Sequence, residues 1–185
     1  KPQYWVRYIV PEKKDFDQYY NVISNSLLWP LQHYLFDVVR KPAIDDAVHA
    51  AWREGYRKVN RLFAEEIVKE IRSTDRKPLV FLQDYHLCLC AHYIRRKEPD
   101  VLIHHFTHSP WIQPDYFRFL PHSMRRELLN GMLACDVLGF HTHFYASNFL
   151  QCCREGEAVR VAVDPKRRVV RHGSRETYVR HYPIS

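Results

Sequence analysis

Residues 77–99 read KPLVFLQDYHLCLCAHYIRRKEP, and this stretch contains the unit from which the fold is predicted. Leu79–Leu82 is an apolar run with the length and composition of a buried strand. Apolar residues then repeat at helical spacing at Leu87, Cys90, Ala91 and Ile94. Lys97-Glu98-Pro99 is a helix stop signal. A strand, a polar loop and a helix thus follow one another, as in a parallel α/β sheet.

The same alternation continues on both sides of this unit. Strands are predicted at Val101–Phe106 and Val137–Phe140, and helices at Pro121–Ala134 and Phe144–Cys153. Upstream, Asp45–Arg72 predicts a long amphipathic helix that covers one side of the sheet. Three short basic runs predict a small β excursion before the last strand: Val159–Val163, Arg168–Arg171 and Thr177–His181. We therefore predict a doubly wound α/β fold.

Composition limits the class of protein. The chain has 185 residues, 46% of them hydrophobic, which suits one domain with its own core. The net charge of +7 favours anionic partners, but we expect neither a nucleic-acid nor a membrane partner, because no aromatic-basic RNA motif and no apolar run of roughly 20 residues occurs. The odd number of five cysteines indicates reduced, mostly buried thiols and a soluble cytoplasmic protein.

Two further features bear on what the chain contains. No glycine-rich phosphate loop is present, so a nucleotide would be held by something this chain lacks. The chain begins in an extended aromatic segment, Tyr4–Val10, and stops after the last predicted strand. We therefore expect it to be part of a larger enzyme.

Polar residues follow three predicted strands, in the loops Gln83–His86, Thr107–Trp111 and His141–His143. In open parallel sheets ligands bind beyond the carboxyl ends of the strands, so these loops should share one rim. Asp84 suits hydrogen bonds from sugar hydroxyls, or alternatively the N-cap of the next helix. His108 suits donation to a ligand oxygen, or alternatively a buried position that shapes the turn.

Metal and thiol chemistry are disfavoured. His104 and His105 are adjacent in a strand and point to opposite faces, so they cannot chelate one ion, and we expect no metal and no cofactor. Cys88 and Cys90 lack an activating motif. The segment Tyr19–Tyr34 mixes aromatics with amides and hydroxyls, which suits a carbohydrate ring or a core aromatic cluster.

The order of these motifs resembles the trehalose-6-phosphate synthase family of retaining glycosyltransferases. The matching motifs are Tyr-Tyr-Asn-x-x-Ser-Asn-x-x-Leu-Trp-Pro-Leu-x-His-Tyr at Tyr19–Tyr34, Asp-Tyr-His-Leu at Asp84–Leu87, His-Ser-Pro at His108–Pro110 and Leu-Gly-Phe-His-Thr at Leu138–Thr142. They occur in collinear order over nearly the whole chain.

The resemblance implies one lobe of a two-lobed GT-B fold, a Rossmann-like parallel sheet with helices on both faces. Residues 1–185 would be the acceptor-binding N-terminal lobe without its first strand and glycine loop, and the C-terminal donor lobe would be absent from this chain. The fragment alone should then be inactive. The implied partners are a nucleotide-sugar donor and a sugar-phosphate acceptor; a homo-oligomer is compatible with the sequence.

The same resemblance implies roles for five residues. Tyr20 and Trp29 would form the acceptor pocket, Asp84 and His108 would act at the reaction centre, and Tyr85 would also contact substrate. The implied reaction is retaining transfer from UDP-glucose or a GDP-sugar to a sugar phosphate, without a required metal.

Departures from the family pattern lie at the predicted cleft. Typical members read His-Asp-Tyr-His at Gln83–His86, His-Thr/Ile-Pro-Phe-Pro at His108–Ile112 and Pro-Ile-Gly at Pro183–Ser185. The substrates therefore stay open. Alternatives are a pseudo-glycosyltransferase that couples a nucleotide cyclitol to a phosphorylated aminocyclitol (validoxylamine 7′-phosphate synthase type), a glucosylglycerol-phosphate synthase, and a non-catalytic lobe that binds sugar phosphate.

Overall fold

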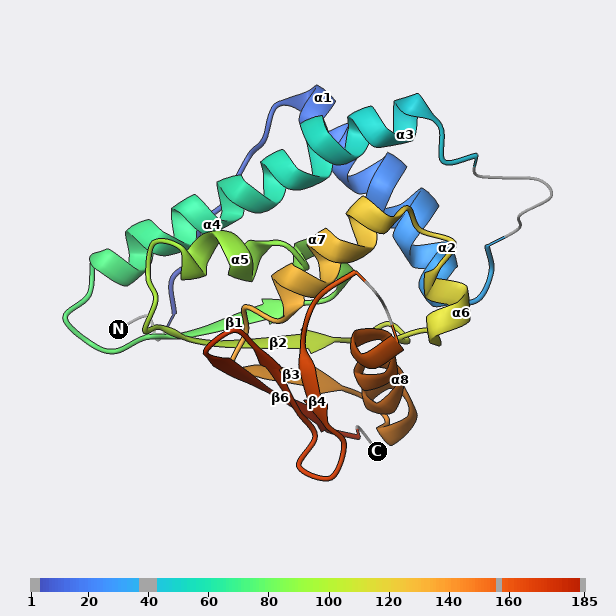
Figure 1. Ribbon diagram of the computed structural model, residues 1–185. Helices are drawn as coiled ribbons and strands as arrows, with labels where there is room; N and C mark the ends of the chain where they lie inside the picture. Colours follow the sequence, from blue (N-terminus) through green and yellow to red (C-terminus); the bar gives the residue numbers. More distant parts are fainter. Residues whose placement is uncertain (1–3, 37–42, 156–157, 184–185) are drawn as a thin grey trace.

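The computed structural model describes residues 4–36, 43–155 and 158–183, and its centre is a six-stranded mixed sheet (Figure 1). The strand order is β1-β2-β3-β6-β5-β4. The strands are β1 (Leu79–Gln83), β2 (Leu102–Thr107), β3 (Val137–Phe140), β4 (Ala162–Asp164), β5 (Val169–His172) and β6 (Arg175–His181). The predicted strands are thus confirmed to within a few residues.

Strand direction separates the sheet into two parts. β1, β2, β3 and β6 are parallel neighbours, whereas β4 and β5 are antiparallel and precede β6 as the predicted excursion. The register places Gln83 beside Phe106 and Thr107 beside Phe140, so these strands end at a common edge. The α/β Rossmann-like class is confirmed, with a parallel core extended by an antiparallel pair.

Two long helices are each built from an α-helical start, a π-helical middle and an α-helical end. The first comprises α1 (Lys13–Phe16), η1 (Asp17–Leu28) and α2 (Trp29–Gln32). The second comprises α3 (Asp46–Ala51), η2 (Trp52–Tyr56) and α4 (Arg57–Arg72), and Asp45 begins it by accepting a hydrogen bond from the backbone N–H of Val48 at 3.0 Å. The amphipathic helix predicted upstream of the sheet is therefore confirmed.

Shorter helices connect the strands. They are η3 (Tyr85–Leu87), α5 (Cys90–Arg95), α6 (Pro114–Phe117), α7 (His122–Met132) and α8 (His143–Glu155). The aromatic segment at residues 4–10 forms neither strand nor helix. No helix within the described residues is long and apolar enough to cross a membrane. All five cysteines are buried and free, as predicted.

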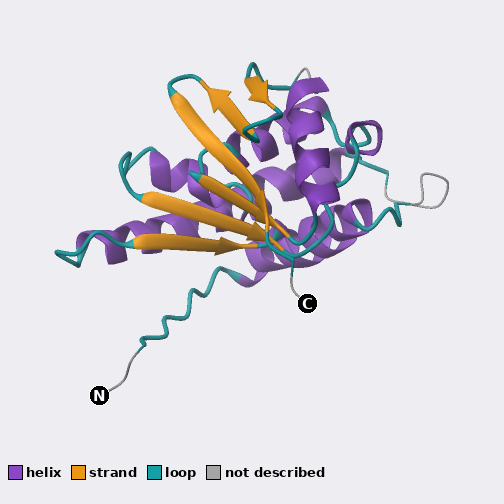
Figure 2. Ribbon diagram, turned by 90° about the horizontal axis from the view of Figure 1, so that it is seen from below, coloured by secondary structure: helices purple, strands orange, loops and turns teal. Residues whose placement is uncertain are grey.

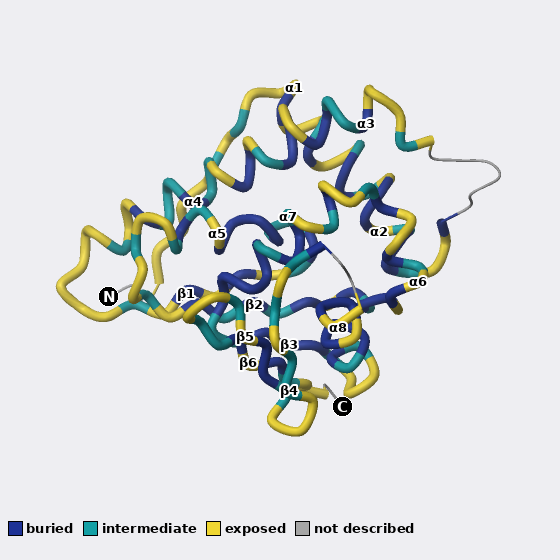
Figure 3. Tube along the Cα trace, in the orientation of Figure 1, coloured by how far each residue is buried: buried dark blue, intermediate teal, exposed yellow. Residues whose placement is uncertain are grey.

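Helices α4, α5 and α7 lie over one face of the sheet, and seen from the other side the parallel strands lie in front of the helices (Figures 1 and 2). Buried residues gather between these two layers (Figure 3). On the opposite face Leu79, Phe81 and Leu102 are 60%, 61% and 56% exposed. The resemblance to the family implied helices on both faces of the sheet. Among the described residues, helices cover only one face of the sheet.

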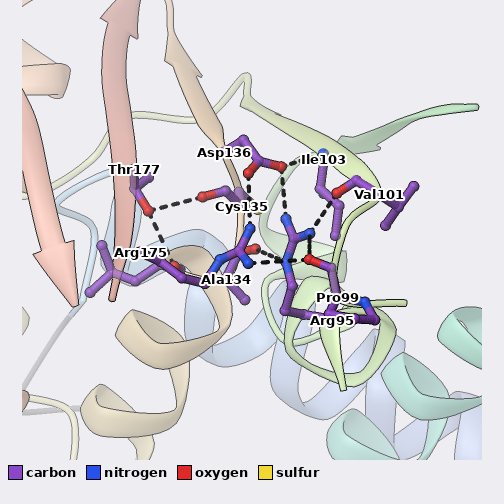
Figure 4. A network of polar contacts seen from close by, with 10 residues as sticks. Arg95, Pro99, Val101, Ile103, Ala134, Cys135, Asp136, Arg175 and Thr177 are labelled. Carbon is purple, nitrogen blue, oxygen red and sulfur yellow. Dashed lines mark hydrogen bonds and ion pairs between the residues drawn. The ribbon is translucent and has the colours of Figure 1, made fainter. Parts of the chain in front are cut away.

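A polar network ties together the amino ends of the strands, opposite the predicted rim (Figure 4). The carboxylate of Asp136 pairs with Arg95 of α5 at 2.7 Å and with Arg175 of β6 at 3.0 Å. It also accepts a hydrogen bond from the backbone N–H of Ile103 at 2.8 Å. Because the two arginines belong to elements far apart in the sequence, the network fixes β2, β3, β6 and α5 relative to one another.

Candidate functional site

Loops from three parallel strands meet at the carboxyl edge of the sheet, as predicted. The Nε2 atom of His108, after β2, lies 2.6 Å from Oε1 of Gln83 at the end of β1. The ring of His141, after β3, lies 5.4 Å from that of His108 in an edge-on arrangement. The rim is therefore continuous across β1, β2 and β3.

Asp84 has a strained backbone, with φ of 60° and ψ of 178°. This region is populated almost only by glycine, and another residue there costs on the order of 1–3 kcal/mol. The surrounding structure holds it on both sides. Its N–H donates to the carbonyl of Phe106 at 2.8 Å, and its own carbonyl lies 3.0 Å from Nε2 of His105. Non-glycine residues in such conformations cluster at functional sites.

His105 is fully buried beneath this turn. Burial lowers its pKa to about 4, with partial opposition from the hydrogen bond to Asp84. The imidazole is therefore neutral near pH 7 and donates from Nε2, while Nδ1 has no hydrogen-bond partner among the described residues. From the sequence, His105 only helped to exclude a metal site, and its contact with Asp84 was not predicted.

The Asp84 carboxylate is held by the loop after β2. Its Oδ1 accepts hydrogen bonds from the backbone N–H and the hydroxyl of Ser109, at 3.2 and 2.9 Å. The same hydroxyl lies 2.7 Å from Oε1 of the buried Gln32, and its single proton serves one acceptor at a time. The Asp84 side chain makes no cap hydrogen bond to the helix that follows. The alternative role as an N-cap is therefore wrong.

His108 is exposed, so the alternative of a buried histidine shaping the turn is also wrong. Its ring lies edge-on to Phe106, with centroids 4.8 Å apart. The contacts with Gln83, Phe106 and His141 orient the imidazole while leaving it open to solvent.

The π-helical turns of η1 place Tyr20 and Trp29 on a common side. An α-helix has 3.6 residues per turn and a π-helix about 4.4, so positions nine apart are separated by about 2.5 turns in the first and about two in the second. The wider turns therefore bring the two side chains to one face. They are 39% and 41% exposed, so neither is the core aromatic of the alternative interpretation.

This helix face adjoins the loop after β1. The ring of Tyr20 stacks on that of His86 with centroids 5.5 Å apart, and the hydroxyl of Tyr85 donates to Oδ1 of Asn25 at 3.3 Å. Tyr85 is buried, and burial followed by the charge of Asp84 raises its pKa to about 12. Of the five predicted residues, Tyr85 alone is buried, and its hydroxyl already has a partner.

The second long helix also holds this loop. The fully buried Asn60 donates to the carbonyl of His86 at 3.0 Å and accepts from the N–H of Leu89 at 3.1 Å. The hydroxyl of Tyr56 donates to the carbonyl of Tyr85. The sequence indicated a buried helix face here but not which of its polar groups would reach the loop.

The geometry offers one carboxylate, one exposed imidazole and two exposed aromatic rings around the same rim. A carboxylate and an imidazole can exchange hydrogen bonds with sugar hydroxyls, and aromatic faces pack against sugar rings. Among the described residues no group of three or more histidine, cysteine, aspartate or glutamate side chains is arranged to hold a metal ion.

Comparison with known proteins places these features in a family. The model of glycosyltransferase family 20 matches residues 1–185. The chain belongs to this family. An Aspergillus niger alpha,alpha-trehalose-phosphate synthase [UDP-forming] is 41% identical over 147 residues, which cover 74% of this chain and 27% of that protein. The Pichia angusta synthase of the same description is 35% identical over 173 residues, covering 91% and 33%.

Solved structures give the same result for the fold of this family 20 chain. The E. coli trehalose-6-phosphate structure with bound UDP-2-fluoro glucose has a TM-score of 0.77 at 30% identity, covering 94% of this chain and 35% of that one. The N-terminal domain of a Candida albicans trehalose-6-phosphate phosphatase has a TM-score of 0.76 at 27% identity, covering 95% and 34%. The chain spans between a quarter and about a third of the length of these relatives.

Proposed function

We propose that this chain is the acceptor-side lobe of a retaining glycosyltransferase that transfers a hexose from UDP-glucose to a sugar phosphate. The observation that carries this proposal is the strained, doubly held Asp84 beside the exposed His108. The relatives described as UDP-forming trehalose-phosphate synthases support the donor and the product class.

The residues divide into two groups by their position. Asp84 accepts hydrogen bonds from sugar hydroxyls and His108 donates to a sugar oxygen, so that both position substrate and stabilise developing charge without forming a covalent intermediate. Tyr20 offers a hydroxyl beside the acceptor phosphate, and Trp29 covers the apolar face of its ring. The leaving phosphate of the donor takes the proton from the acceptor hydroxyl.

The test uses the two-lobed protein, meaning this lobe joined to its donor lobe, with UDP-glucose and glucose 6-phosphate as substrates. Asp84→Asn removes a charge but keeps the shape, and we expect turnover to fall about a hundredfold or more with the melting temperature nearly unchanged. Trp29→Ala should raise the acceptor KM much more than the donor KM.

Matched controls are available for both variants. Asp45 caps α3, and asparagine is as good an N-cap as aspartate, so Asp45→Asn should leave both the melting temperature and turnover nearly unchanged. Trp5 is 90% exposed in the N-terminal segment, so Trp5→Ala should change neither KM. Normal turnover in Asp84→Asn would refute the assignment, and better use of a cyclitol phosphate would move the acceptor to the aminocyclitol class.

A second candidate is a lobe that binds sugar phosphate without transferring sugar. The observation that favours it is the similarity to the N-terminal domain of the Candida albicans trehalose-6-phosphate phosphatase. Saturable binding of glucose 6-phosphate with no product from UDP-glucose in the two-lobed protein would select this candidate.

A further inference from the structure

A groove on the helical layer is strongly basic and lies on α4, α5 and α7, and none of the five predicted site residues lines it. It consists of two adjoining cavities of about 480 and 320 Å³ that share Arg57, Tyr93 and Arg96. In Figure 1 α4 and α5 lie side by side on the helical side of the sheet, and α7 packs next to α5. The proposed glycosyl transfer makes no use of this groove.

Cations outnumber carboxylates among the side chains that line the groove. The cations are Arg57, Arg61, Arg96, Lys97 and Arg126, and the carboxylates are Glu65 and Glu127. Glu127 lies 3.3 Å from Nε of Arg57 and also accepts a hydrogen bond from the indole N–H of Trp52 at 3.1 Å. Glu65 lies 3.8 Å from Lys97.

Three guanidinium groups are left without a carboxylate. Within the described residues, Arg61, Arg96 and Arg126 have no acidic side chain within 4.0 Å. Arg61 is held over the ring of Tyr93, 5.7 Å from its centroid, which fixes this guanidinium at the wall of the groove. The pKa of His92 is lowered mainly by burial and further by the positive charge of Arg96.

We propose that this groove binds a small molecule that carries a phosphate group. Guanidinium groups present paired N–H donors that match phosphate oxygens. Arg61 and Arg96 line the first cavity and Arg96 and Arg126 the second, so each cavity offers two unpaired guanidinium groups to a dianion. The volume suits a small ligand held between helices.

The groove is built on the helices that hold the loop after β1. Arg57 directly follows Tyr56, and Arg61 directly follows Asn60. Tyr56 and Asn60 are buried and hydrogen-bond to that loop. Tyr93 lies in α5 and Arg96 directly follows it, and α5 continues from the same loop. Residues 85–89 contact the long helix that contains α4 and lead directly into α5. An anion bound to both α4 and α5 therefore holds together the two helices on either side of this loop.

The test is a titration of the two-lobed protein with inorganic phosphate against chloride at matched ionic strength, followed by calorimetry and by melting temperature. We expect saturable binding and a rise in melting temperature with phosphate. Arg61→Gln combined with Arg96→Gln should weaken binding about tenfold or more. Lys13→Gln combined with Lys14→Gln removes the same charge from exposed positions on α1 and should leave binding unchanged.

Three further measurements keep the outcome decisive. Arg126→Gln alone should weaken binding on its own, and the melting temperature without phosphate reports whether each variant is folded. Tyr20→Phe should retain the phosphate affinity; because Tyr20 is the residue assigned to the acceptor phosphate, this result separates the groove from the proposed acceptor pocket. Phosphate binding that is absent, or equally strong in the Arg61/Arg96 variant, overturns the proposal, as does an oligonucleotide that binds this groove and is not displaced by phosphate.

Discussion

Replacement of Gly131 by alanine sets two effects of opposite sign against each other. Gly131 lies in α7, where alanine is favoured over glycine by about 1 kcal/mol. A Cβ atom at this position would, however, lie 2.1 Å from the carbonyl oxygen of Cys88 and 2.9 Å from Cα of Leu89. Real Cβ atoms essentially never approach a heavy atom closer than 3.0 Å, so the helix and the loop must separate by at least 3.0 − 2.1 = 0.9 Å.

The clash should prevail because the atoms on the far side belong to the backbone and cannot rotate away. Overpacking of this kind costs about 1–3 kcal/mol, so after the gain of about 1 kcal/mol in helix propensity we expect a net loss of up to about 2 kcal/mol. A chain of this size then melts a few degrees lower. Because Cys88 and Leu89 follow Asp84 by a few residues, a displacement near 1 Å should also reduce kcat, by up to about a hundredfold.

The assay combines denaturant unfolding with steady-state kinetics of the two-lobed protein. Gly173→Ala is the control: this glycine has φ of 61° and open space around it, so alanine there costs about 1 kcal/mol through backbone strain and should leave kcat unchanged. A Gly131→Ala protein that is stabilised by about 1 kcal/mol and retains normal kinetics would refute the packing of α7 against this loop.

Two further predictions concern the partners of Asp84. Ser109→Ala removes one of two hydrogen bonds to the carboxylate, so kcat should fall about tenfold while stability changes by about 1 kcal/mol. Ser109→Thr keeps the hydroxyl and should restore kcat. Equal kinetics for the parent protein and both variants would contradict a positioning role. His105 has a pKa of about 4 in the folded protein, below the 6.5 of a free histidine, so the unfolded chain binds the proton more tightly. Its contribution to stability should be complete above pH 6.5 and fall by roughly 3 kcal/mol as the pH drops to 4. His105→Gln should flatten unfolding curves measured over that window, and an unchanged slope would show that other groups cause the loss.

The sequence predicted the order of elements well because each one is a local pattern. Leu79–Leu82 and Val137–Phe140 are apolar runs of strand length, and Asp45–Arg72 repeats its apolar residues at helical spacing. The common edge of the strands then followed from parallel topology alone. By contrast, an apolar run cannot reveal which face of β1 stays open, because Leu79 and Phe81 are as apolar as Val80 and Leu82.

The candidate site was predictable in its members but not in its geometry. Spacing alone left Asp84 and His108 between two roles each, and the resemblance to a family selected Tyr20 and Trp29. The contact between Ser109 and Asp84 joins residues 25 positions apart, and no local pattern reports it. The positive φ of Asp84 was equally hidden, because few residues other than glycine adopt it and no local pattern marks those that do.

The π-helical segment Asp17–Leu28 also determines which changes of length this protein can accept. Its serines stabilise the wide turns by bonding five residues back, Ser24 to the carbonyl of Tyr19 and Ser26 to that of Asn21. Deleting one residue between Tyr20 and Trp29 would rotate everything beyond the gap by most of a right angle and carry the indole off the shared face. Natural variation here should therefore occur by replacement, and gaps in this stretch should mark relatives whose acceptor differs.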